Sequence, residues 1–432
     1  AIDGDIADTI KDESKEGEVT HFQALATAVS GTVGNGNIAG VALAIALGGP
    51  GATFWMVVCG FLGMSTKFVE CTLGVQYRDV GEDGTVYGGP MYYISKGLKE
   101  RGFEVFGKIT AIIFAIFCIG GSFGGGNAAQ SNQATVVLKE LMGLESTGAG
   151  FWIGVIMAIV VGIIIIGGIK RIASVTEKVV PFMAVLYLLA CLYILGANFS
   201  LIDDAFSLIL REAFNPTAIG VGGVIGVLLV GFKRAAFSNE AGAGSASIAH
   251  SAVKTKYSAS EGLVALLEPF IDTVVICTMT ALVIIIFNFG GDASGATIFQ
   301  YGGDGAGAVL IDGVSYEGAG ITSKAFAQYI PYSNVFLTVA VVLFAVSTMI
   351  SWSYYGLQSW KFLFGRGKAA DMAYKLLFLL FVIIGASASM NSIWAFSDAM
   401  IFAMVFPNMV GLYFLFPVVK KQLNRYIEAI KS

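Results

Sequence analysis

Two apolar stretches of this chain are interrupted by glycine, asparagine and other polar residues where a membrane helix would be continuous. The first interruption covers residues 31–37 (GTVGNGN) within the apolar run 22–47. The second begins at Gly231 and Phe232 and continues through residues 238–245 (SNEAGAGS) within the run 217–252. An unpaired backbone amide is costly in hydrocarbon, so such peptide groups are expected to line a cavity or hold a ligand. A pair of interrupted spans is typical of a secondary transporter with a site near the bilayer midplane.

The composition places the whole chain in a membrane. Of its 432 residues, 56% are hydrophobic and 13% are charged, and the mean hydropathy is +0.76, above the range of soluble proteins. Apolar runs of spanning length recur, so we expect one all-α polytopic domain in the lipid bilayer of the cell membrane. The five cysteines lie in apolar runs without CxxC spacing, and we expect them to be free thiols.

Ten hydrophobic segments are predicted to cross the membrane. The sixth contains the second interruption, and the tenth contains Pro407, which predicts a kink or a split. The predicted spans cover residues 22–47, 52–77, 109–138, 151–169, 179–199, 217–252, 263–289, 334–364, 370–388 and 392–419.

The distribution of basic residues tests this topology. With the amino terminus in the cytoplasm, the cytoplasmic segments hold twenty lysines and arginines, whereas the outer segments hold three. This bias agrees with the positive-inside rule and supports both the span count and the orientation. The acidic segment 1–20 is then a cytoplasmic tail, and residues 421–432 form a second one.

The interrupted spans are the first and the sixth, so the chain divides into halves of five spans each. We expect an inverted repeat with one half at 21–200 and the other at 213–420. Between the seventh and eighth spans, the outer loop 290–331 is rich in glycine and aspartate. Residues 309–316 within it predict a β-hairpin that turns at Asp312 and Gly313. We interpret this loop as a solvated connector; the alternative is that it shapes an entrance.

The interruptions offer two kinds of backbone group. The amino end of a half-helix presents free N–H groups and suits a carboxylate, whereas the carboxyl end presents carbonyls that suit Na+ or an ammonium group. Thr32, Asn35 and Asn37 add short polar side chains to the first interruption. A zwitterion could thus be held without a charged side chain. The alternative is that the glycines are packing notches between helices.

Spans three and eight carry polar residues at membrane depth. Asn127 and Gln130 are three residues apart and therefore predicted to share a face, where they contact a substrate or bond across helices. Ser347 and Thr348 either complete a Na+ shell with carbonyls of span one or bond back to their own helix. Trp352 either caps a small pocket or packs in the core.

Ionisable residues inside spans are functional candidates by default. Lys67 and Glu70 are predicted to form a structural ion pair within span two. Glu240, at the second interruption, is expected to neutralise Lys233 or Arg234, to act as a gate, or to carry a proton.

No arrangement of residues indicates an enzyme. Glu268 and Asp272 are four residues apart and share one face of span seven. His21 and His250 lie near span ends without the spacing of a metal site or a catalytic motif. We therefore expect no catalytic activity.

Several sequence motifs are similar to those of one family. The chain resembles the alanine or glycine:cation symporters, which include the sodium:alanine symporters, from about residue 20 to 420. The resemblance implies a leucine-transporter-type fold, with a 5+5 inverted repeat and broken first and sixth helices, and uptake of alanine and glycine with Na+ or, in some members, H+. The motifs are GNGNIAG (34–40), GGPMYY (88–93), GGN (125–127), FSNEAG (237–242), IAH (248–250) and WSYYG (352–356).

The resemblance also implies two sets of binding residues. Substrate contacts are expected from the first break and from spans three, six and eight, and Na+ contacts from carbonyls and hydroxyls of spans one and eight. The substrate set is Thr32, Gly34, Asn35, Gly36, Asn127, Gln130, Gly231, Phe232 and Trp352, and the cation set is Ser30, Val33, Asn37, Phe344, Ser347 and Thr348.

The chain departs from the family pattern in three ways. The family usually carries a further hydrophobic helix upstream, so eleven spans are expected in the natural protein. Asn35 stands where we expect threonine, and its larger amide would re-tune the pocket. The loop 290–331 is longer than usual.

The leading hypothesis is a monomeric symporter that imports small neutral amino acids with Na+ by alternating access and has no nucleic-acid partner. The nearest alternative is a proton-coupled carrier of the same fold, with Glu240 or Asp398 as the proton site. From a different class, an ion channel would need a filter, which several subunits usually supply. The sequence leaves the exact substrate, its chirality and the stoichiometry open.

Overall fold

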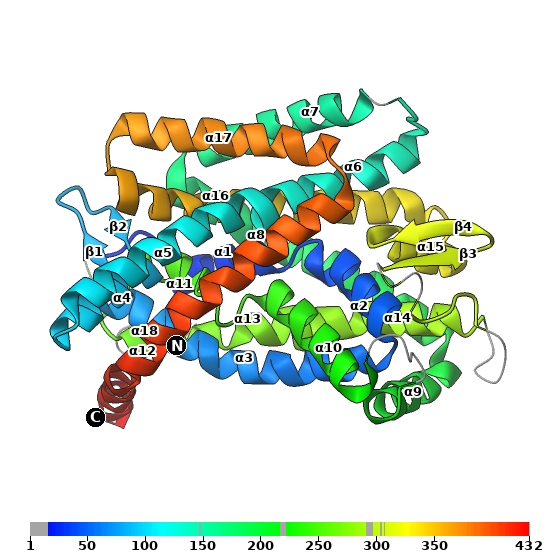
Figure 1. The fold of residues 1–432 in the computed structure, drawn as a ribbon, viewed down its shortest axis with the longest axis horizontal. Coiled ribbons are helices and arrows are strands. Elements are labelled where there is room, and N and C mark those ends of the chain that lie inside the picture. The colour runs from blue at the N-terminus through cyan, green and yellow to red at the C-terminus, as the bar shows by residue number, and fades with distance from the viewer. Residues whose placement is uncertain are drawn as a thin grey trace.

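The computed structural model describes residues 16–146, 148–216, 222–290, 297–302, 305 and 307–431. The predicted acidic tail at 1–20 therefore lies mostly outside the described residues. Most of the helices run along the long axis of the molecule (Figure 1). The carboxyl terminus and the strands β1 and β2 lie toward one end, and β3, β4 and α9 lie at the other (Figure 1).

Helices occur at each of the ten predicted spans. Within the described part of the chain, seven helices are long and apolar enough to cross a membrane, and the bent pair in the first span adds an eighth. The fourth span is the shorter apolar helix α7, and the sixth is α10 with α11. The first five spans are α1 (His21–Thr32) with η1 (Gly36–Gly40) and α2 (Val41–Gly48); α3 (Gly51–Gln76); α5 (Glu104–Phe123) with η2 (Gly124–Ala128) and α6 (Ala129–Met142); α7 (Ala149–Ile165); and α8 (Gly168–Ala197).

The second five spans differ from the prediction mainly in their ends. The tenth neither splits nor stops at Pro407, because a proline inside a membrane helix is tolerated where neighbouring groups replace the lost hydrogen bond. The elements are α10 (Gly223–Asn239) with α11 (Ala246–His250); α12 (Ser258–Ala265) with α13 (Leu267–Pro269), η5 (Phe270–Cys277) and α14 (Thr278–Asn288); α16 (Ser333–Phe364); α17 (Lys368–Ser387); and α18 (Met390–Lys431).

Short elements connect the spans. The connection between α3 and α5, predicted to be cytoplasmic, contains a two-stranded sheet and α4, and the connections predicted to lie outside contain α9, a β-hairpin and α15. Their bounds are β1 (Asp79–Val80), β2 (Val86–Tyr87), α4 (Pro90–Glu100), η3 (Phe199–Leu201), α9 (Ile202–Phe214), β3 (Ala308–Ile311), β4 (Val314–Glu317) and α15 (Ala319–Tyr329).

The predicted hairpin in the outer loop is present. Strands β3 and β4 pair in antiparallel register up to Ile311 and Val314. Asp312 and Gly313 have φ angles of 53° and 78°, and two consecutive residues with positive φ are typical of the tight turn that suits a hairpin. The Thr322 hydroxyl of α15, which follows the hairpin, donates to the Ile38 carbonyl at 3.1 Å. The loop is therefore tied to the first span.

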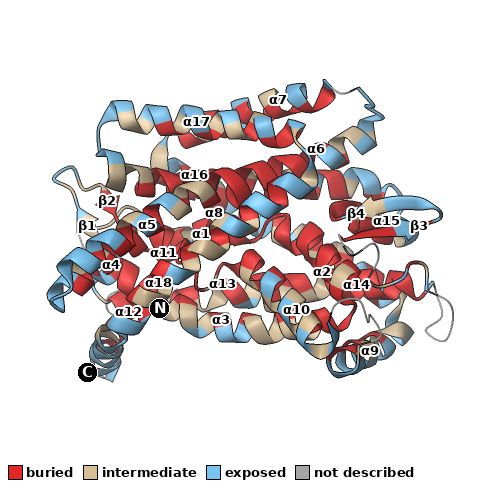
Figure 2. Cartoon of the chain, viewed as in Figure 1, coloured by how far each residue is buried: buried red, intermediate tan, exposed pale blue. Residues whose placement is uncertain are grey.

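Burial places α16 at the centre of the bundle. In its most apolar 18-residue window, 67% of residues are buried, against 28% for α17. Figure 2 shows the same contrast between α16 and the outer pair α7 and α17. A helix that is buried on nearly all sides contacts other helices rather than lipid, so polar groups on α16 face protein.

Candidate substrate and cation site

The first break lies between α1 and α2. Helix α1 ends at Thr32, Val33 is extended, and the two half-helices meet at an angle of 49°. The Asn35 carbonyl accepts from the Ala39 amide at 2.8 Å and from the Gly40 amide at 3.2 Å, so the chain re-enters the helix through a π-helical turn. The unwound part is shorter than the predicted 31–37.

The second break lies between α10 and α11. Helix α10 ends at Asn239, and Glu240 has a φ of 56°. The Gly242 amide donates to Glu70 Oε1 at 2.8 Å, and the Gly242 carbonyl accepts from Asn408 Nδ2 at 2.7 Å. Side chains from α3 and α18 thus satisfy both backbone groups of Gly242 within the break.

The prediction that this break begins at Gly231 and Phe232 is wrong. Both residues lie inside α10, because Gly231 is a packing notch. A Cβ atom there would lie 2.6 Å from the Ala52 carbonyl oxygen and 2.7 Å from Trp55 Cβ on α3. The Phe232 ring meets Trp55 at 6.3 Å between centroids. Neither residue belongs to the group of polar residues at the first break.

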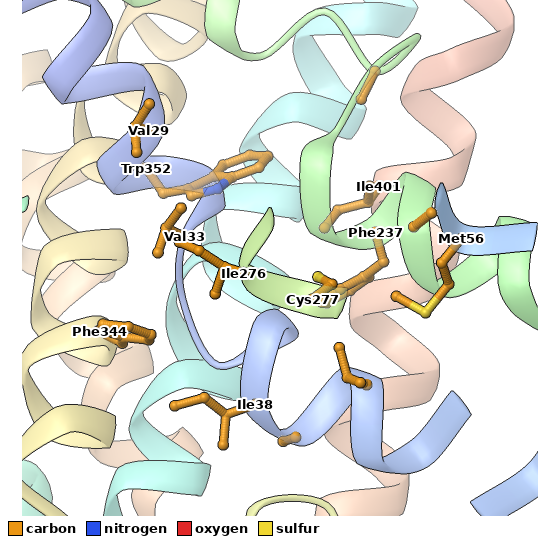
Figure 3. Packing of buried hydrophobic residues seen from close by; sticks show 14 of the residues in the cluster. Val29, Val33, Ile38, Met56, Phe237, Ile276, Cys277, Phe344, Trp352 and Ile401 are labelled. Carbon is orange, nitrogen blue, oxygen red and sulfur yellow. The ribbon is translucent and has the colours of Figure 1, made fainter. Parts of the chain in front are cut away.

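Oxygen atoms of α1 and α16 converge beside the first break. The Ser30 hydroxyl donates to the Ser347 carbonyl at 2.7 Å, and the Thr348 hydroxyl donates to the Ser30 carbonyl at 3.1 Å. The Ser347 hydroxyl donates to the Phe344 carbonyl at 3.0 Å. Figure 3 shows Val33 and Phe344 among the buried side chains of this region. Neutral hydroxyl and carbonyl oxygens are the ligands that hard cations prefer.

Gln130 joins this group from α6. Its Oε1 accepts from the Asn35 amide at 3.0 Å, its carbonyl accepts from Asn35 Nδ2 at 3.3 Å, and its Nε2 donates to the Gly125 carbonyl at 3.0 Å. A Cβ atom on Gly34 would lie 2.4 Å from Thr348 Oγ1 and 3.1 Å from Gln130 Oε1. Glycine is therefore needed at residue 34 for spans one, three and eight to meet.

Asn127 does not share this face, contrary to the prediction. Its Nδ2 donates to the Phe378 carbonyl of α17 at 2.7 Å. The reason is η2, the π-helical turn that includes Asn127. An α-helix brings residues three apart onto one face, but a π-helical turn holds more residues and rotates the side chains that precede it. The Asn127 side chain forms a hydrogen bond between two helices, whereas the Gln130 side chain faces the first break.

The remaining predicted residues of the first break have separate surroundings. The Thr32 hydroxyl bonds back to the Val29 carbonyl of its own helix at 3.3 Å. A Cβ atom on Gly36 would lie 3.6 Å from Ser238 Oγ, so Gly36 faces α10. Trp352 is 1% exposed, and its Nε1 donates to Glu240 Oε1 at 2.8 Å.

Asn37 belongs to a second polar group, centred on Asp272. Asn37 Nδ2 donates to Asp272 Oδ1 at 2.7 Å, and the hydroxyls of Ser238 and Thr273 donate to the same carboxylate at 3.2 Å and 2.6 Å. Sequence reasoning paired Asp272 only with a neighbour on its own span. Its place inside an apolar span was the available signal, but nothing in the spacing indicated Asn37 as its partner.

Two predicted charge pairings are also wrong. Lys67 pairs with Glu268 of α13 at 2.9 Å, with both side chains fully buried, instead of with its neighbour Glu70. Lys233 and Arg234 both pair with Asp398 of α18, at 2.8 Å and 2.5 Å, instead of with Glu240. In each case the partner comes from a distant span, which a rule for neighbours on one helix cannot predict.

The fold is that of known transporters. The structure superimposes on MhsT in complex with L-phenylalanine with a TM-score of 0.57 and 17% sequence identity, covering 93% of this chain and 89% of that one. It also matches the Eremococcus coleocola manganese transporter with a TM-score of 0.59 and 14% identity, covering 94% and 82%. At these identities the likeness supports the leucine-transporter-type fold alone.

The sequence matches give the family. Residues 5–432 match the sequence model of the sodium:alanine symporter family. The sodium/alanine symporter AgcS of Methanococcus maripaludis is 40% identical over 98% of this chain and 87% of its own length. The sodium/proton-dependent alanine carrier protein of Bacillus sp. strain PS3 is 32% identical over 97% and 91%. This chain is a multi-pass protein of the cell membrane and belongs to the sodium:alanine symporter family of secondary transporters.

Proposed function

We propose that this protein imports small neutral amino acids, alanine and glycine, together with Na+ by alternating access. The observation that carries the proposal is the contact of α16 with the end of α1 and the break: Ser30 exchanges hydrogen bonds with the Ser347 carbonyl and the Thr348 hydroxyl, and Gly34 lies against that hydroxyl. Backbone and hydroxyl oxygens suit a monovalent cation, and the Gly34 and Asn35 amides, which donate to the Asn37 and Gln130 side chains, would suit a carboxylate once those side chains turn away. Membership of a symporter family and the name of the AgcS relative support both the solute and the ion.

The proposed cation site uses oxygens that hydrogen-bond to one another. The Ser30 carbonyl accepts from the Thr348 hydroxyl, and the Phe344 carbonyl accepts from the Ser347 hydroxyl. Rotation of the two hydroxyls would free the Ser30 and Phe344 carbonyls to bind an ion. Val33 adds a further backbone carbonyl from the break. Asn37 borders this site as well as the group around Asp272, because its Oδ1 accepts from the Gly34 amide of the break at 2.8 Å and its Nδ2 donates to Asp272.

The proposed amino-acid site lies next to it. Gly34, Asn35 and Gly36 would supply backbone groups, with Thr32 at the end of α1 and Gln130 of α6 beside them. Trp352 would limit the size of the side chain. We further propose that the chain works as a monomer, with residues 21–200 and 213–420 as the two inverted halves.

Transport by purified protein in proteoliposomes tests this function. Uptake of alanine is measured with an inward Na+ gradient and with equal Na+ on both sides. One co-transported charge gains about 2.3 kcal/mol per 100 mV of membrane potential, so uptake should rise with the gradient and again with an inside-negative potential. Equal uptake under all conditions would refute sodium coupling. Glycine and D-alanine as competitors define the substrate range.

A proton-coupled carrier is the second candidate. The name of the Bacillus sp. strain PS3 relative includes proton dependence, and Glu240 is a buried carboxylate at the second break. Uptake driven by a pH gradient in the absence of Na+ would favour this candidate. Uptake that needs Na+ at every pH gradient would exclude it.

A further inference from the structure

Glu240 lies where the second break begins, and both of its carboxylate oxygens accept hydrogen bonds. Oε1 accepts from Trp352 Nε1 at 2.8 Å, and Oε2 accepts from the Ser245 hydroxyl. The residue is 3% exposed. Its φ of 56° is a left-handed conformation that residues other than glycine adopt only when the surrounding structure enforces it. The backbone of the break thus points this carboxylate at span eight.

No basic side chain among the described residues lies within ion-pair distance of Glu240. The two bases expected to neutralise it, Lys233 and Arg234, pair with Asp398 instead. A buried carboxylate without a cationic partner is costly. It is stabilised there by the two hydrogen bonds that it accepts, one of them from the Trp352 indole. The carboxylate is therefore suited to holding the indole firmly.

The indole of Trp352 is fixed on its other sides by packing. A Cβ atom on Gly126 would lie 2.1 Å from Trp352 Cγ, and one on Gly121 would lie 3.3 Å from its Cζ3. The Tyr355 ring meets it edge-on at 5.4 Å between centroids. Span three thus provides a glycine-lined surface for the ring. Among the described residues, the hydrogen bond to Glu240 is the one polar contact that sets the direction of its tip.

The hydrogen bond joins two parts of the proposed site. Trp352 lies one helical turn beyond Thr348 on the same side of α16, next to the proposed cation oxygens. Glu240 lies in the unwound segment of span six, two residues from Ser238 and Gly242. Figure 3 shows Trp352 beside the residues of the first break, near Val29 and Val33.

We propose that Glu240 is a positioning residue that fixes the Trp352 indole against the amino-acid site, so that the size limit on the substrate depends on this hydrogen bond. The inference rests on the proposed function, because it assumes that Trp352 borders the bound amino acid. Without the bond, the indole tip is free to move away from the site, and side chains larger than a methyl group can enter.

Four variants test this proposal: Glu240→Ala, Glu240→Gln, Trp352→Phe and the double variant Glu240→Ala with Trp352→Phe. Glutamine keeps an oxygen that accepts from the indole, and phenylalanine keeps a ring but removes the donor. Binding of alanine and of leucine is measured by thermal shift of the purified protein at constant Na+. Trp360→Phe is the matched control, because Trp360 is on the same helix and its Nε1 has no hydrogen-bond partner among the described residues.

We expect Glu240→Ala and Trp352→Phe each to raise the affinity for leucine relative to alanine about tenfold, which equals about 1.4 kcal/mol. The double variant should equal either single one, because both remove the same bond. Glu240→Gln and Trp360→Phe should keep the discrimination of the wild type.

Two outcomes would overturn the proposal. One is wild-type discrimination in Trp352→Phe, and the other is loss of discrimination in Glu240→Gln equal to that in Glu240→Ala. If Glu240→Ala does not fold, Trp352→Phe and Glu240→Gln still give opposite predictions. Because binding is measured at constant Na+, a failure of sodium coupling would refute the proposed function and leave this test intact.

Discussion

At the scale of single residues, the proposed site depends on close packing at one glycine and on hydrogen bonds between two helices. Gly34 leaves room for Thr348 and Gln130, and hydroxyls and carbonyls of α1 and α16 satisfy one another. A change of one atom is therefore expected to affect ion binding without unfolding the bundle. Two substitutions test these contacts: one removes a hydroxyl group, and the other adds a methyl group.

Thr348→Val tests the cation site. Valine keeps the shape of threonine but replaces the hydroxyl with a methyl group, so the Ser30 carbonyl loses its donor and the ion loses a ligand. With a loss of about 1–2 kcal/mol, the Na+ concentration for half-maximal uptake should rise about tenfold. Titration of alanine uptake with Na+ measures this. Thr338→Val is the control, because the Thr338 hydroxyl on the same helix faces the Val137 carbonyl at 3.5 Å; an equal effect there would disprove the assignment.

Gly126→Ala tests the packing surface of Trp352. The added methyl group would lie 2.1 Å from Trp352 Cγ, so the ring or the helix must move. Overpacking of this kind costs about 1–3 kcal/mol, and the melting temperature in detergent should fall. Gly40→Ala should be tolerated, because a Cβ atom on Gly40 meets nothing within 4 Å. Equal melting temperatures for both variants would show that span three or the Trp352 ring can shift to accommodate the methyl group at little cost.

At the scale of elements, buried charged and titratable side chains link several helices. Glu261 of α12 accepts from His21 of α1 and from His250 of α11, the latter at 2.5 Å. Lys67 of α3 pairs with Glu268 of α13. These contacts tie spans one, two, six and seven together, so we expect these spans to move as one body.

Lys67→Met tests this connection. The substitution removes the lysine that pairs with the buried Glu268 carboxylate and leaves it His250 Nε2, 3.7 Å from Oε2. Breaking a buried pair costs about 3–5 kcal/mol. The melting temperature in detergent should fall clearly, and adding Glu268→Leu should restore much of it. Lys99→Ala is the control, because its pair with Glu104 is 63% exposed on both sides and contributes roughly 1 kcal/mol or less. A small effect of Lys67→Met would mean that this pair does not hold α3 to α13.

How much of these elements could be read from the sequence depends on the kind of signal. Long apolar runs predicted where helices lie at all ten predicted spans, seven of which, or eight with the bent pair, are long and apolar enough to cross a membrane in the described part of the chain. The Asp312–Gly313 turn was predicted because few residues accept positive φ. The π-helical turns at Asn35 and Asn127 leave no comparable signal, and they decide which polar side chains face the site. Gly231 was wrongly predicted to begin the break, because glycine is typical both of unwound segments and of places where two helices pack closely.

At the scale of the whole molecule, the contact between α10 and α18 is the main candidate for closing the outer side. Asp398 pairs with Lys233 and Arg234, and the Arg234 guanidinium stacks on Phe237 and Trp394 at 5.4 Å and 5.5 Å from their ring centres. Alternating access requires such a contact to break when the outer side opens.

Asp398→Asn tests this closure. The amide removes the charge that holds both bases, so the outward-open population should grow. In a Phe237→Cys background, a membrane-impermeant thiol reagent should then label about tenfold faster, measured by mass spectrometry. Asp371→Asn is the matched control, because Asp371 also pairs with two bases, Lys361 and Lys375, but lies at the start of α17. Equal labelling rates in both variants would exclude this gate.

The hairpin β3–β4 is connected through α15 to the buried first break. The hairpin leads directly into α15, whose Thr322 hydroxyl bonds to the Ile38 carbonyl of η1. We therefore expect a rearrangement of the first break to shift α15 and the hairpin joined to it. We expect an antibody fragment that binds only one conformation of this hairpin to slow transport without touching either proposed binding site.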